Sequence, residues 1–399
     1  MLSEKAKGLK PSPTLALATK AKELKAQGED VISLSVGEPD WDTFENIKKA
    51  GIDSIKDGQT KYAPSSGIPE LRKVISERTN RQIQTDYTPD HVTVTSGAKF
   101  VIYSALQMIC DPGDEIIIPS PYWVSYPTMV ELSGGFPRVV QTDSQSGFKL
   151  TAEVLESNIT EKTKGIIFNS PSNPTGNMYS LEELKAIGEV LLKHPNVVIL
   201  SDDIYNELVF VQDEIAPHLL QATPELAERT IVINGVSKTY SMTGWRLGWA
   251  IGPKDVISAM TKFQSQTVSC ASPFTQQAAV EALLNSDKQV QEKVQVLKQR
   301  RDKAVAQLND IEGISCLPPD GAFYLWPNIS SLCKPKHDPS PIKSSKDFAK
   351  MLLEKKRVVV VPGAEFGQEG YLRISYALGE ERMTEAIRRI SDFVKELNA

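Results

Sequence analysis

Two cationic side chains, those of Lys238 and Arg246, follow a strongly apolar stretch of the sequence. The stretch reads T-I-V-I-N-G-V, and S-K-T-Y-S-M-T-G-W-R-L-G-W comes directly after it. A lysine is usually a solvated surface charge. After a buried strand, however, an amine is partly desolvated and close to other cations, which lowers its pKa and makes it a nucleophile for carbonyl carbons. The pattern therefore suggests Schiff-base chemistry at Lys238.

Arg246 and the turn Ser96-Gly97-Ala98 suggest a phosphate site. A buried guanidinium needs an anion, and the planar fork of Arg246 matches phosphate oxygens. The turn follows the apolar run H-V-T-V-T and precedes a helical pattern. Its backbone N–H groups and the start of the helix could bind the same phosphate. Taken alone, this turn is more simply an ordinary tight turn.

Four more residues have types that suit a flat polar ring. Asp202 comes after the run V-V-I-L, and it could cap a helix or pair with a protonated ring nitrogen. Tyr205 could donate to a ring oxygen. Asn173, in N-P-T-G, could be a turn residue or an amide donor to the same oxygen. Trp123 could stack on the ring or pack in the core.

These requirements together describe one ligand, a flat phosphorylated pyridine aldehyde. Lys238 would take its aldehyde, Asp202 its ring nitrogen, and Asn173 with Tyr205 its phenolic oxygen. Arg246 and the Ser-Gly-Ala turn would take its phosphate. The ligand with these groups is pyridoxal 5′-phosphate (PLP), an electron sink whose reaction the protein directs.

The elements that must position these residues follow one pattern. Short apolar runs at 91–95, 115–119, 165–168, 196–200 and 230–234 alternate with helical patterns. Such runs predict parallel strands that are covered on both faces, and ligands bind past the carboxyl ends of such strands. We expect an α/β large domain over 46–285. A smaller α+β domain would comprise 286–399 and the N-terminal segment 1–45, with an exposed, Pro-rich loop near 334–346.

The composition excludes several other classes of protein. The chain has 399 residues, a charged fraction of 24% and a net charge of −5, which argue against nucleic acid or an anionic membrane as partners. Its four cysteines form no C-x-x-C pair, so we expect free thiols and no metal site. The charged N-terminus and the lack of a long apolar run predict no signal peptide and no membrane span, and hence a cytoplasmic protein.

Several motifs, in order along nearly the whole chain, resemble those of class I/II aminotransferases of fold type I. The most specific are N-S-P-S-N-P-T-G at 169–176 and S-K-x-x-x-x-x-G-x-R at 237–246, joined by V-G-E-P-D-W at 36–41 and G-A-F-Y at 321–324. The resemblance is in particular to the bacterial aspartate aminotransferases, including aspartate/prephenate aminotransferases. It implies PLP as cofactor and a mostly parallel seven-stranded sheet in the large domain.

The resemblance also implies a role for each matching residue. Lys238 would form the Schiff base and move the proton, with Asp202 and Tyr205 as the other catalytic residues. Tyr62 would reach the cofactor phosphate of a partner subunit, which makes a homodimer necessary. The remaining cofactor-binding residues would be Asn173, Trp123, Gly97, Ala98, Lys99, Ser237 and Arg246. Ala98 departs from the family pattern, because many relatives have glycine there.

On the substrate side, Arg373 in L-R-I-S-Y matches the arginine that binds the α-carboxylate, and a bidentate arginine suits that group. Gly37 would contact the substrate through its backbone, next to Trp123 and Asn173. Lys99 stands where relatives that prefer acidic substrates have a lysine. Lys10 is near the position at which some relatives have a basic residue linked to the use of prephenate.

The implied activity is the transfer of an amino group between aspartate or glutamate and a 2-oxo acid such as 2-oxoglutarate or oxaloacetate. It would be a ping-pong reaction via pyridoxamine phosphate. A prephenate or aromatic aminotransferase and a PLP-dependent β-lyase stay open as alternatives. A transcriptional regulator is disfavoured because V-G-E-P-D-W comes so early in the chain. A nucleotide-binding enzyme is disfavoured because neither G-x-x-x-x-G-K-[ST] nor G-x-G-x-x-G after a strand occurs.

Overall fold

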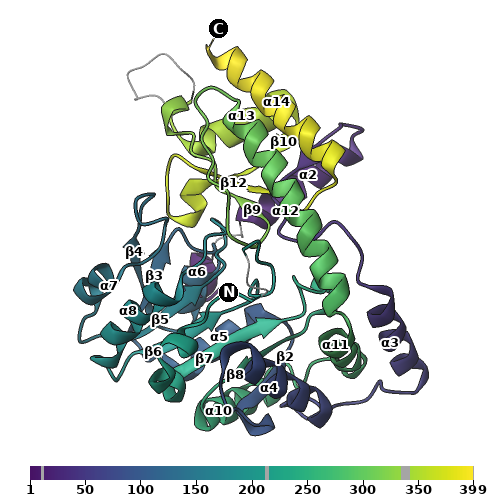
Figure 1. The fold of residues 1–399 in the computed structure, drawn as a ribbon, viewed down its shortest axis with the longest axis vertical. Coiled ribbons are helices and arrows are strands. Elements are labelled where there is room, and N and C mark those ends of the chain that lie inside the picture. Colours follow the sequence, from purple (N-terminus) through teal and green to yellow (C-terminus); the bar gives the residue numbers. More distant parts are fainter. Residues whose placement is uncertain (10–12, 212–214, 334–341, 399) are drawn as a thin grey trace.

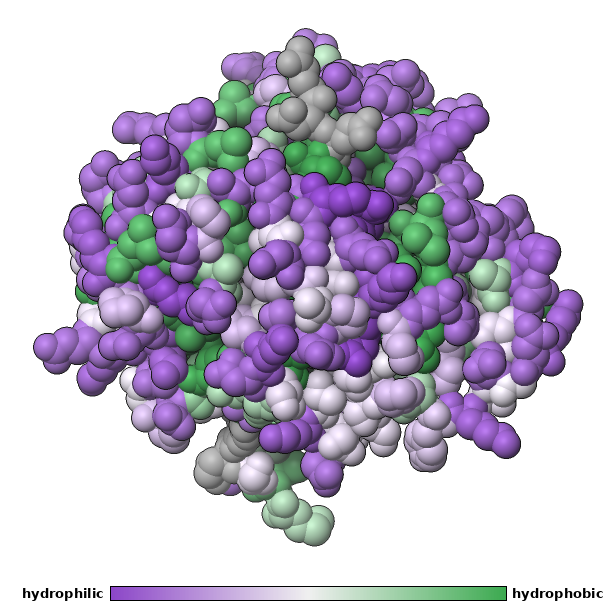
Figure 2. All heavy atoms as spheres, turned by 60° about the horizontal axis from the view of Figure 1, so that its bottom comes forward, coloured by the Kyte–Doolittle hydropathy of each residue, from purple (hydrophilic) through white to green (hydrophobic). Residues whose placement is uncertain are grey.

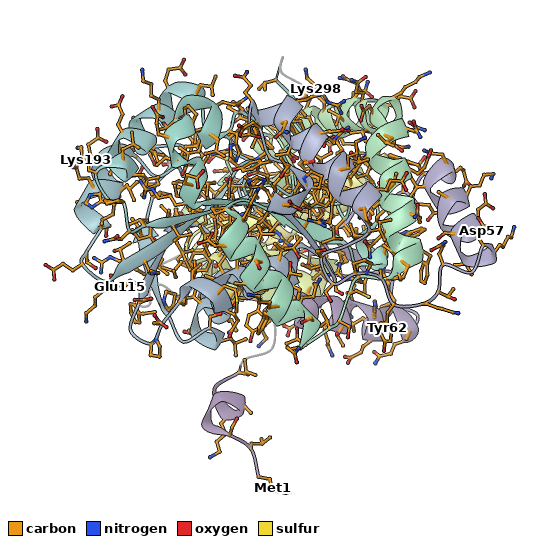
Figure 3. All side chains as sticks on the ribbon, turned by 90° about the horizontal axis from the view of Figure 1, so that it is seen from below. Met1, Asp57, Tyr62, Glu115, Lys193 and Lys298 are labelled. Carbon is orange, nitrogen blue, oxygen red and sulfur yellow. The ribbon has the colours of Figure 1, made fainter. Side chains whose placement is uncertain are left out.

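The computed structural model describes residues 1–9, 13–211, 215–333 and 342–398. It has one region built on a large sheet and a second, smaller region that contains the C-terminal helices (Figure 1). Seen from below, most of the chain and its side chains form one dense body, and Met1 lies apart from this body (Figure 3). The face shown in Figure 2 is largely hydrophilic, with separate apolar patches.

The large sheet has seven strands, in the spatial order β2-β8-β7-β6-β5-β3-β4. All neighbours are parallel except β8, which is antiparallel to both β2 and β7. The mostly parallel seven-stranded sheet expected from the sequence is therefore confirmed. Its strands are β2 (Val92–Thr95), β3 (Glu115–Ser120), β4 (Phe136–Gln141), β5 (Thr163–Asn169), β6 (Val198–Asp202), β7 (Thr230–Gly235) and β8 (Gly248–Ile251).

Helices cover both faces of this sheet. Successive side chains of a strand point to opposite faces, and here both faces are apolar, so both must be covered. Ile116 and Ile118 pack in one apolar cluster, whereas Ile117 packs in another. The first cluster includes α5 (Ala98–Ile109), α6 (Tyr126–Leu132) and α10 (Lys254–Ser265). The second includes α3 (Glu45–Lys56), α4 (Pro69–Ile83), α7 (Ala152–Asn158), α8 (Leu181–Leu192) and α11 (Pro273–Asn285). These helices cover the faces of the sheet, so the edge at the carboxyl ends of the strands is available for a ligand site.

The smaller region contains two short sheets. β1 (Ile32–Ser33) pairs in parallel with β10 (Val358–Val359), so a segment near the N-terminus lies beside the C-terminal part. β11 (Val361–Pro362), β12 (Leu372–Ser375) and β9 (Tyr324–Leu325) form an antiparallel sheet. The helices of this region are α2 (Pro13–Ala26), α12 (Asp287–Asn309), α13 (Ser345–Lys356) and α14 (Glu380–Asn398). The domain boundaries near 46 and 285 stay a prediction.

The remaining helices are short. They are α1 (Glu4–Gly8), α9 (Leu219–Ala222) and the 3-10 turns Pro89–His91, Pro224–Arg229, Thr243–Trp245, Ser330–Leu332 and Gly363–Phe366. Across the described ranges, no helix combines the length and the apolar character needed to cross a bilayer.

The start of α8 is capped, because the Ser180 side chain accepts from the Glu183 backbone N–H and the Glu183 side chain accepts from the Ser180 N–H. The expectation of an exposed loop over 334–346 is wrong at its C-terminal end. Ile342 and Ser345 are fully buried there, because α13 begins at Ser345 and packs on the core. Residues 334–341 lie outside the described residues.

Candidate active site

A cavity of about 310 Å³ lies at the carboxyl edge of the large sheet, where the smaller region meets it. Strands β5, β6 and β7 end beside it, and Arg373 enters it from β12. Most of the residues expected from the sequence line this one cavity. They are Gly37, Ala98, Lys99, Trp123, Asn173, Asp202, Tyr205, Ser237, Lys238, Arg246 and Arg373.

Lys238, three residues beyond β7, has a half-buried side chain that points across the cavity. Its Nζ donates a hydrogen bond to the carbonyl oxygen of Gly37, 2.5 Å away. Burial and then the charge of Arg373 lower the pKa of the Lys238 amine to about 8, although the carboxylates of Glu38 and Asp202 oppose this. A substantial fraction of this amine is therefore neutral, and hence nucleophilic, near pH 8.

Asp202, the last residue of β6, places a buried carboxyl group in the cavity wall. The Tyr126 hydroxyl donates to Oδ2 at 2.6 Å, and the Ile204 backbone N–H donates to Oδ1 at 3.4 Å. Burial raises the pKa of Asp202 to about 6, while these hydrogen bonds and the Lys238 charge lower it. The group is thus mainly a carboxylate at neutral pH, able to bind a cationic N–H group.

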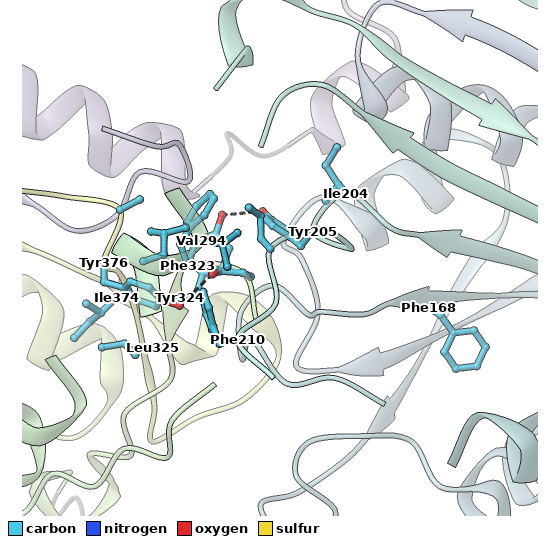
Figure 4. Close-up of a cluster of buried hydrophobic side chains, with 14 of the residues drawn as sticks. Phe168, Ile204, Tyr205, Phe210, Val294, Phe323, Tyr324, Leu325, Ile374 and Tyr376 are labelled. Atoms are coloured by element: carbon cyan, nitrogen blue, oxygen red, sulfur yellow. Dashed lines mark hydrogen bonds between the residues drawn. The ribbon is translucent and has the colours of Figure 1, made fainter. Parts of the chain in front are cut away.

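Tyr205 and Asn173 line the same cavity as Asp202. The Tyr205 Oη is 2.9 Å from the Tyr324 Oη (Figure 4). The backbone N–H of Asn173 donates to Asn169 Oδ1, and the Asn169 amide donates to the Asp202 carbonyl oxygen at 2.8 Å. Asn169 therefore ties the Asn173 loop to the strand that carries Asp202.

The start of α5 and Arg246 form a cationic corner of the site. Gly97 has φ +93° and precedes α5 without a side-chain cap, so the first N–H groups of the helix are available to a ligand. A Cβ atom on Gly97 would lie 2.6 Å from Arg246 Nη2, which shows how closely the guanidinium approaches this turn. The opposing glycine is also required, since a Cβ on Gly248 would lie 2.4 Å from the Ala98 nitrogen.

Arg246 is exposed in the single chain, so the expectation that it is buried is wrong. It has φ +55° after the turn Thr243–Trp245, which directs its side chain to the cavity edge. Its Nη1 donates to the Thr243 carbonyl oxygen at 2.8 Å. In the part of the chain that the structure describes, no carboxylate pairs with Arg246. A helix start and an unpaired guanidinium fit a phosphate group.

Arg373 is a buried cation that lacks an anionic partner among the described residues. It is only 2% exposed, and its two Nη atoms donate to Asn173 Oδ1 and the Ser35 carbonyl oxygen. Its Nε has no hydrogen-bond partner. Burial lowers the pKa of Arg373, yet guanidinium groups keep their proton. A buried cation without a counter-ion is costly, and a ligand carboxylate would satisfy it.

Lys99 and Trp123 lie together at the rim of the cavity. The Lys99 Nζ is 4.8 Å from the centre of a Trp123 ring, within reach of a cation–π interaction. Partial desolvation and the charge of Arg246 lower the pKa of Lys99. Trp123 also packs edge-on against Tyr126, at 5.3 Å between ring centres. Its other surface borders the cavity, where a flat ring could stack.

Tyr62 and Gly97 are not among the residues that line the cavity. The Tyr62 side chain is 91% exposed on the surface of the chain (Figure 3). Gly97 is buried, and it adjoins Ala98 and Arg246, which do line the cavity. Lys10 lies outside the described residues. Within the described ranges, no group of three or more metal-binding side chains occurs.

Three residues that contact the site were missed by the sequence reasoning, namely Tyr126, Asn169 and Tyr324. All three lie in recognisable stretches, S-P-Y-W-V-S-Y, N-S-P-S-N-P-T-G and G-A-F-Y. Asn169 ends β5, so its position at the strand terminus was a usable signal. The other two act through contacts with residues remote in sequence, 76 and 119 positions away, which a local pattern does not reveal.

The site and the fold are those of an aminotransferase of fold type I. Residues 29–390 match the family described as aminotransferase class I and II, and the chain belongs to this family. The family resemblance and the fold class expected from the sequence are thereby confirmed.

Particular relatives are similar over the full length. The aspartate/prephenate aminotransferase of Cereibacter sphaeroides is 47% identical over 398 residues, covering 100% of this chain and 99% of the relative. The aspartate aminotransferase of Bacillus subtilis is 44% identical, with 99% of each chain covered. The crystal structure of the Rhizobium meliloti aspartate aminotransferase superimposes with a TM-score of 0.94 at 41% identity, covering 100% and 99% of the two chains. That of Thermus thermophilus with maleate has a TM-score of 0.92 at 38% identity, covering 98% and 99%.

Proposed function

We propose that this aminotransferase uses PLP to move an amino group between aspartate or glutamate and a 2-oxo acid such as 2-oxoglutarate or oxaloacetate. One observation carries the proposal. A single cavity combines an amine of lowered pKa, a buried carboxylate and a buried guanidinium that has no carboxylate partner among the described residues. The amine matches an aldehyde, the buried carboxylate matches a pyridine nitrogen, and the guanidinium matches a substrate carboxylate.

The residues present fit PLP. Lys238 would bind its aldehyde carbon, Asp202 its ring nitrogen, and Tyr205 with Asn173 its ring oxygen. The phosphate would bind at the start of α5, with Arg246. Trp123, Lys99 and Ser237 would complete the cofactor site, beside Gly97 and Ala98. When bound, the cofactor supplies an electron-accepting ring that acidifies the substrate Cα–H bond.

The Lys238 amine would act twice in each half of the reaction. It is the nucleophile that binds the cofactor, and once displaced it is the base nearest the substrate side of the cavity. Its pKa of about 8 suits both removal and return of a proton near neutral pH. The Gly37 carbonyl oxygen accepts a hydrogen bond from Nζ, which holds the amine on the side where Gly37 would meet the substrate. Asp202, as a carboxylate, would keep the ring nitrogen protonated.

Arg373 would bind the α-carboxylate of the substrate through its guanidinium group, which lines the cavity and has no carboxylate partner among the described residues. Lys99 offers a second cation at the cavity rim for the distal carboxylate, beside Trp123. The Thermus thermophilus structure is that of the enzyme with maleate, a dicarboxylate, in keeping with this arrangement. Prephenate is the second candidate substrate, since relatives 47% identical bear the name aspartate/prephenate aminotransferase. Lys10, the residue we linked to prephenate, stays a prediction.

We further propose that the enzyme is a cytoplasmic homodimer. A second cavity, of about 680 Å³, borders the other side of Arg246 and is lined by Ser96 and Trp245, among others. The almost fully exposed Tyr62 is suited to enter this cavity of a partner subunit and to reach the phosphate there. The four cysteines are free thiols, as in a reducing compartment.

A panel of amino donors and 2-oxo acids at matched concentrations tests the proposed reaction. The purified protein with PLP should convert aspartate or glutamate beyond one equivalent per active site only when a 2-oxo acid is present. Sustained turnover of one amino acid alone would instead identify a β-lyase. A higher kcat/KM for prephenate than for oxaloacetate would make the second candidate the main substrate.

A further inference from the structure

Tyr324 occupies a junction of three parts of the active site. It is fully buried at the start of β9, and its hydroxyl group is 2.9 Å from that of Tyr205. A Cβ atom on Gly37 would lie 2.5 Å from the same hydroxyl, so it packs directly on the glycine backbone. The Arg373 guanidinium carbon lies 4.6 Å from the centre of the Tyr324 ring.

The residues that meet at Tyr324 come from different regions of the fold. Tyr205 follows β6 of the large sheet, whereas Tyr324 and Arg373 lie on neighbouring strands of the three-stranded sheet. Figure 4 shows Tyr205 and Tyr324 in the aromatic cluster that also contains Phe323, and the planes of the two tyrosine rings are nearly perpendicular, at 83°. The hydroxyl–hydroxyl bond therefore links the residue next to the cofactor's ring oxygen to the residue next to the substrate carboxylate.

Either hydroxyl can donate in this bond, and Arg373 lowers the pKa of both tyrosines, so the direction follows from what else each hydroxyl binds. Burial raises the pKa of both tyrosines, so both keep their protons. If Tyr205 directs its proton to the ring oxygen, the proton between the two phenols must come from Tyr324. The Arg373 charge lowers the pKa of Tyr324, which makes its hydroxyl a stronger donor. A hydroxyl that accepts one hydrogen bond is polarised and donates its own more strongly.

We propose that Tyr324 is a positioning residue that transmits the charge state of the substrate-carboxylate site at Arg373 to the hydrogen bond between Tyr205 and the cofactor's ring oxygen. The inference rests on the proposed function, because it needs PLP next to Tyr205 and a carboxylate next to Arg373. Tyr324 itself touches neither group in this scheme, and it acts through Tyr205.

Two consequences follow for the holoenzyme. Without the Tyr324 hydroxyl, Tyr205 donates more weakly, so the ring oxygen and the adjacent Lys238 nitrogen hold their shared proton more tightly. The pH midpoint of the visible absorption band then rises. A carboxylate at Arg373 offsets the cation beside the Tyr324 ring, which weakens the same donor. If carboxylate binding raises the pH midpoint of the visible band, the Tyr324 hydroxyl should therefore account for part of that rise.

The test is a pH titration of the visible band of the PLP-loaded protein, with and without maleate. Tyr324→Phe removes the hydroxyl and keeps the ring under Arg373. The midpoint of this variant should rise by about half a pH unit or more, as expected for the loss of one hydrogen bond. Maleate should raise the midpoint less in Tyr324→Phe than in the parent protein. In a Tyr205→Phe background, Tyr324→Phe should cause no further shift.

The matched control is Tyr376→Phe. The Tyr376 hydroxyl is fully buried in the same aromatic cluster, but it donates to the Ala322 carbonyl oxygen at 3.0 Å (Figure 4). This variant should keep the parent midpoint and the parent response to maleate. The inference is overturned if Tyr324→Phe behaves as the parent, if Tyr376→Phe shows the same shift, or if the shift persists in the Tyr205→Phe background. A parent protein that gains no visible band with PLP would instead contradict the proposed function.

Discussion

The carboxyl edge of the large sheet and the small antiparallel sheet supply opposite halves of the active site. On the large-sheet side, Asp202 and Lys238 each come within a few residues of the end of a buried parallel strand. On the small-sheet side, Arg373 lies within β12, and its neighbours come from 338 and 200 positions earlier in the chain. The first set is placed by local chain geometry, and the second set only by the packing of the two regions.

The two halves also differ in how their charges are compensated. The Asp202 carboxylate already accepts hydrogen bonds from Tyr126 and the backbone, so this half is largely preorganised. The Nε atom of Arg373 is buried and has no hydrogen-bond partner. Under the proposed function, the large-sheet half would hold the cofactor, whereas the small-sheet half would be completed by the substrate carboxylate. Substitutions should therefore affect chemistry on one side and substrate binding on the other.

The largest effect is expected for Lys238→Ala. The substitution removes both the nucleophile and the acid–base group, so kcat should fall by at least roughly 10⁴-fold. Steady-state assays with aspartate and 2-oxoglutarate measure this. The control is Lys185→Ala, which removes an exposed lysine of α8 and should keep parent activity. A kcat of Lys238→Ala near the parent value would contradict the assignment of the chemical step to the large-sheet half.

A smaller effect, of a different kind, is expected for Arg373→Lys. The charge stays, but the planar fork that matches a carboxylate is lost, so kcat/KM for aspartate should fall roughly 10- to 100-fold. The loss should lie mainly in KM, because lysine retains the positive charge that lowers the pKa of Lys238. The absorption spectrum of the PLP-loaded variant should match that of the parent protein. A lost or strongly altered PLP band would mean that Arg373 also supports the cofactor.

The smallest effect is a graded dependence on pH. Burial and Arg373 lower the pKa of Lys238 to about 8, so below pH 8 the neutral fraction of the amine falls about tenfold per pH unit. The rate at which the apoprotein captures PLP covalently should therefore rise with pH and level off above pH 8. Stopped-flow absorbance between pH 6 and 9.5 measures this rate. In Arg373→Lys the midpoint should stay near that of the parent, since the cation is retained; a rate independent of pH would contradict the lowered pKa.

The sequence predicted the large-sheet half of the site better than the small-sheet half. Apolar runs followed by Asp202 or Lys238 identify strand ends directly, and strand ends of a parallel sheet converge at one edge. Arg373 looked like an ordinary strand arginine until the family resemblance was considered. The Tyr324–Tyr205 contact could not be predicted, because it depends on how two separate sheets pack. Arg246 was expected to be buried, but a turn with positive φ directs it to the surface of the single chain.

The central claim, that Lys238 binds PLP covalently, is tested most directly by borohydride reduction followed by tryptic digestion and mass spectrometry. An unmodified Lys238 is cleaved by trypsin, whereas a reduced adduct blocks cleavage there and leaves one peptide spanning 230–246. We predict that this longer peptide appears with the added mass of the reduced cofactor. A label on another peptide, or a fully cleaved and unlabelled 230–238 peptide, would contradict the account.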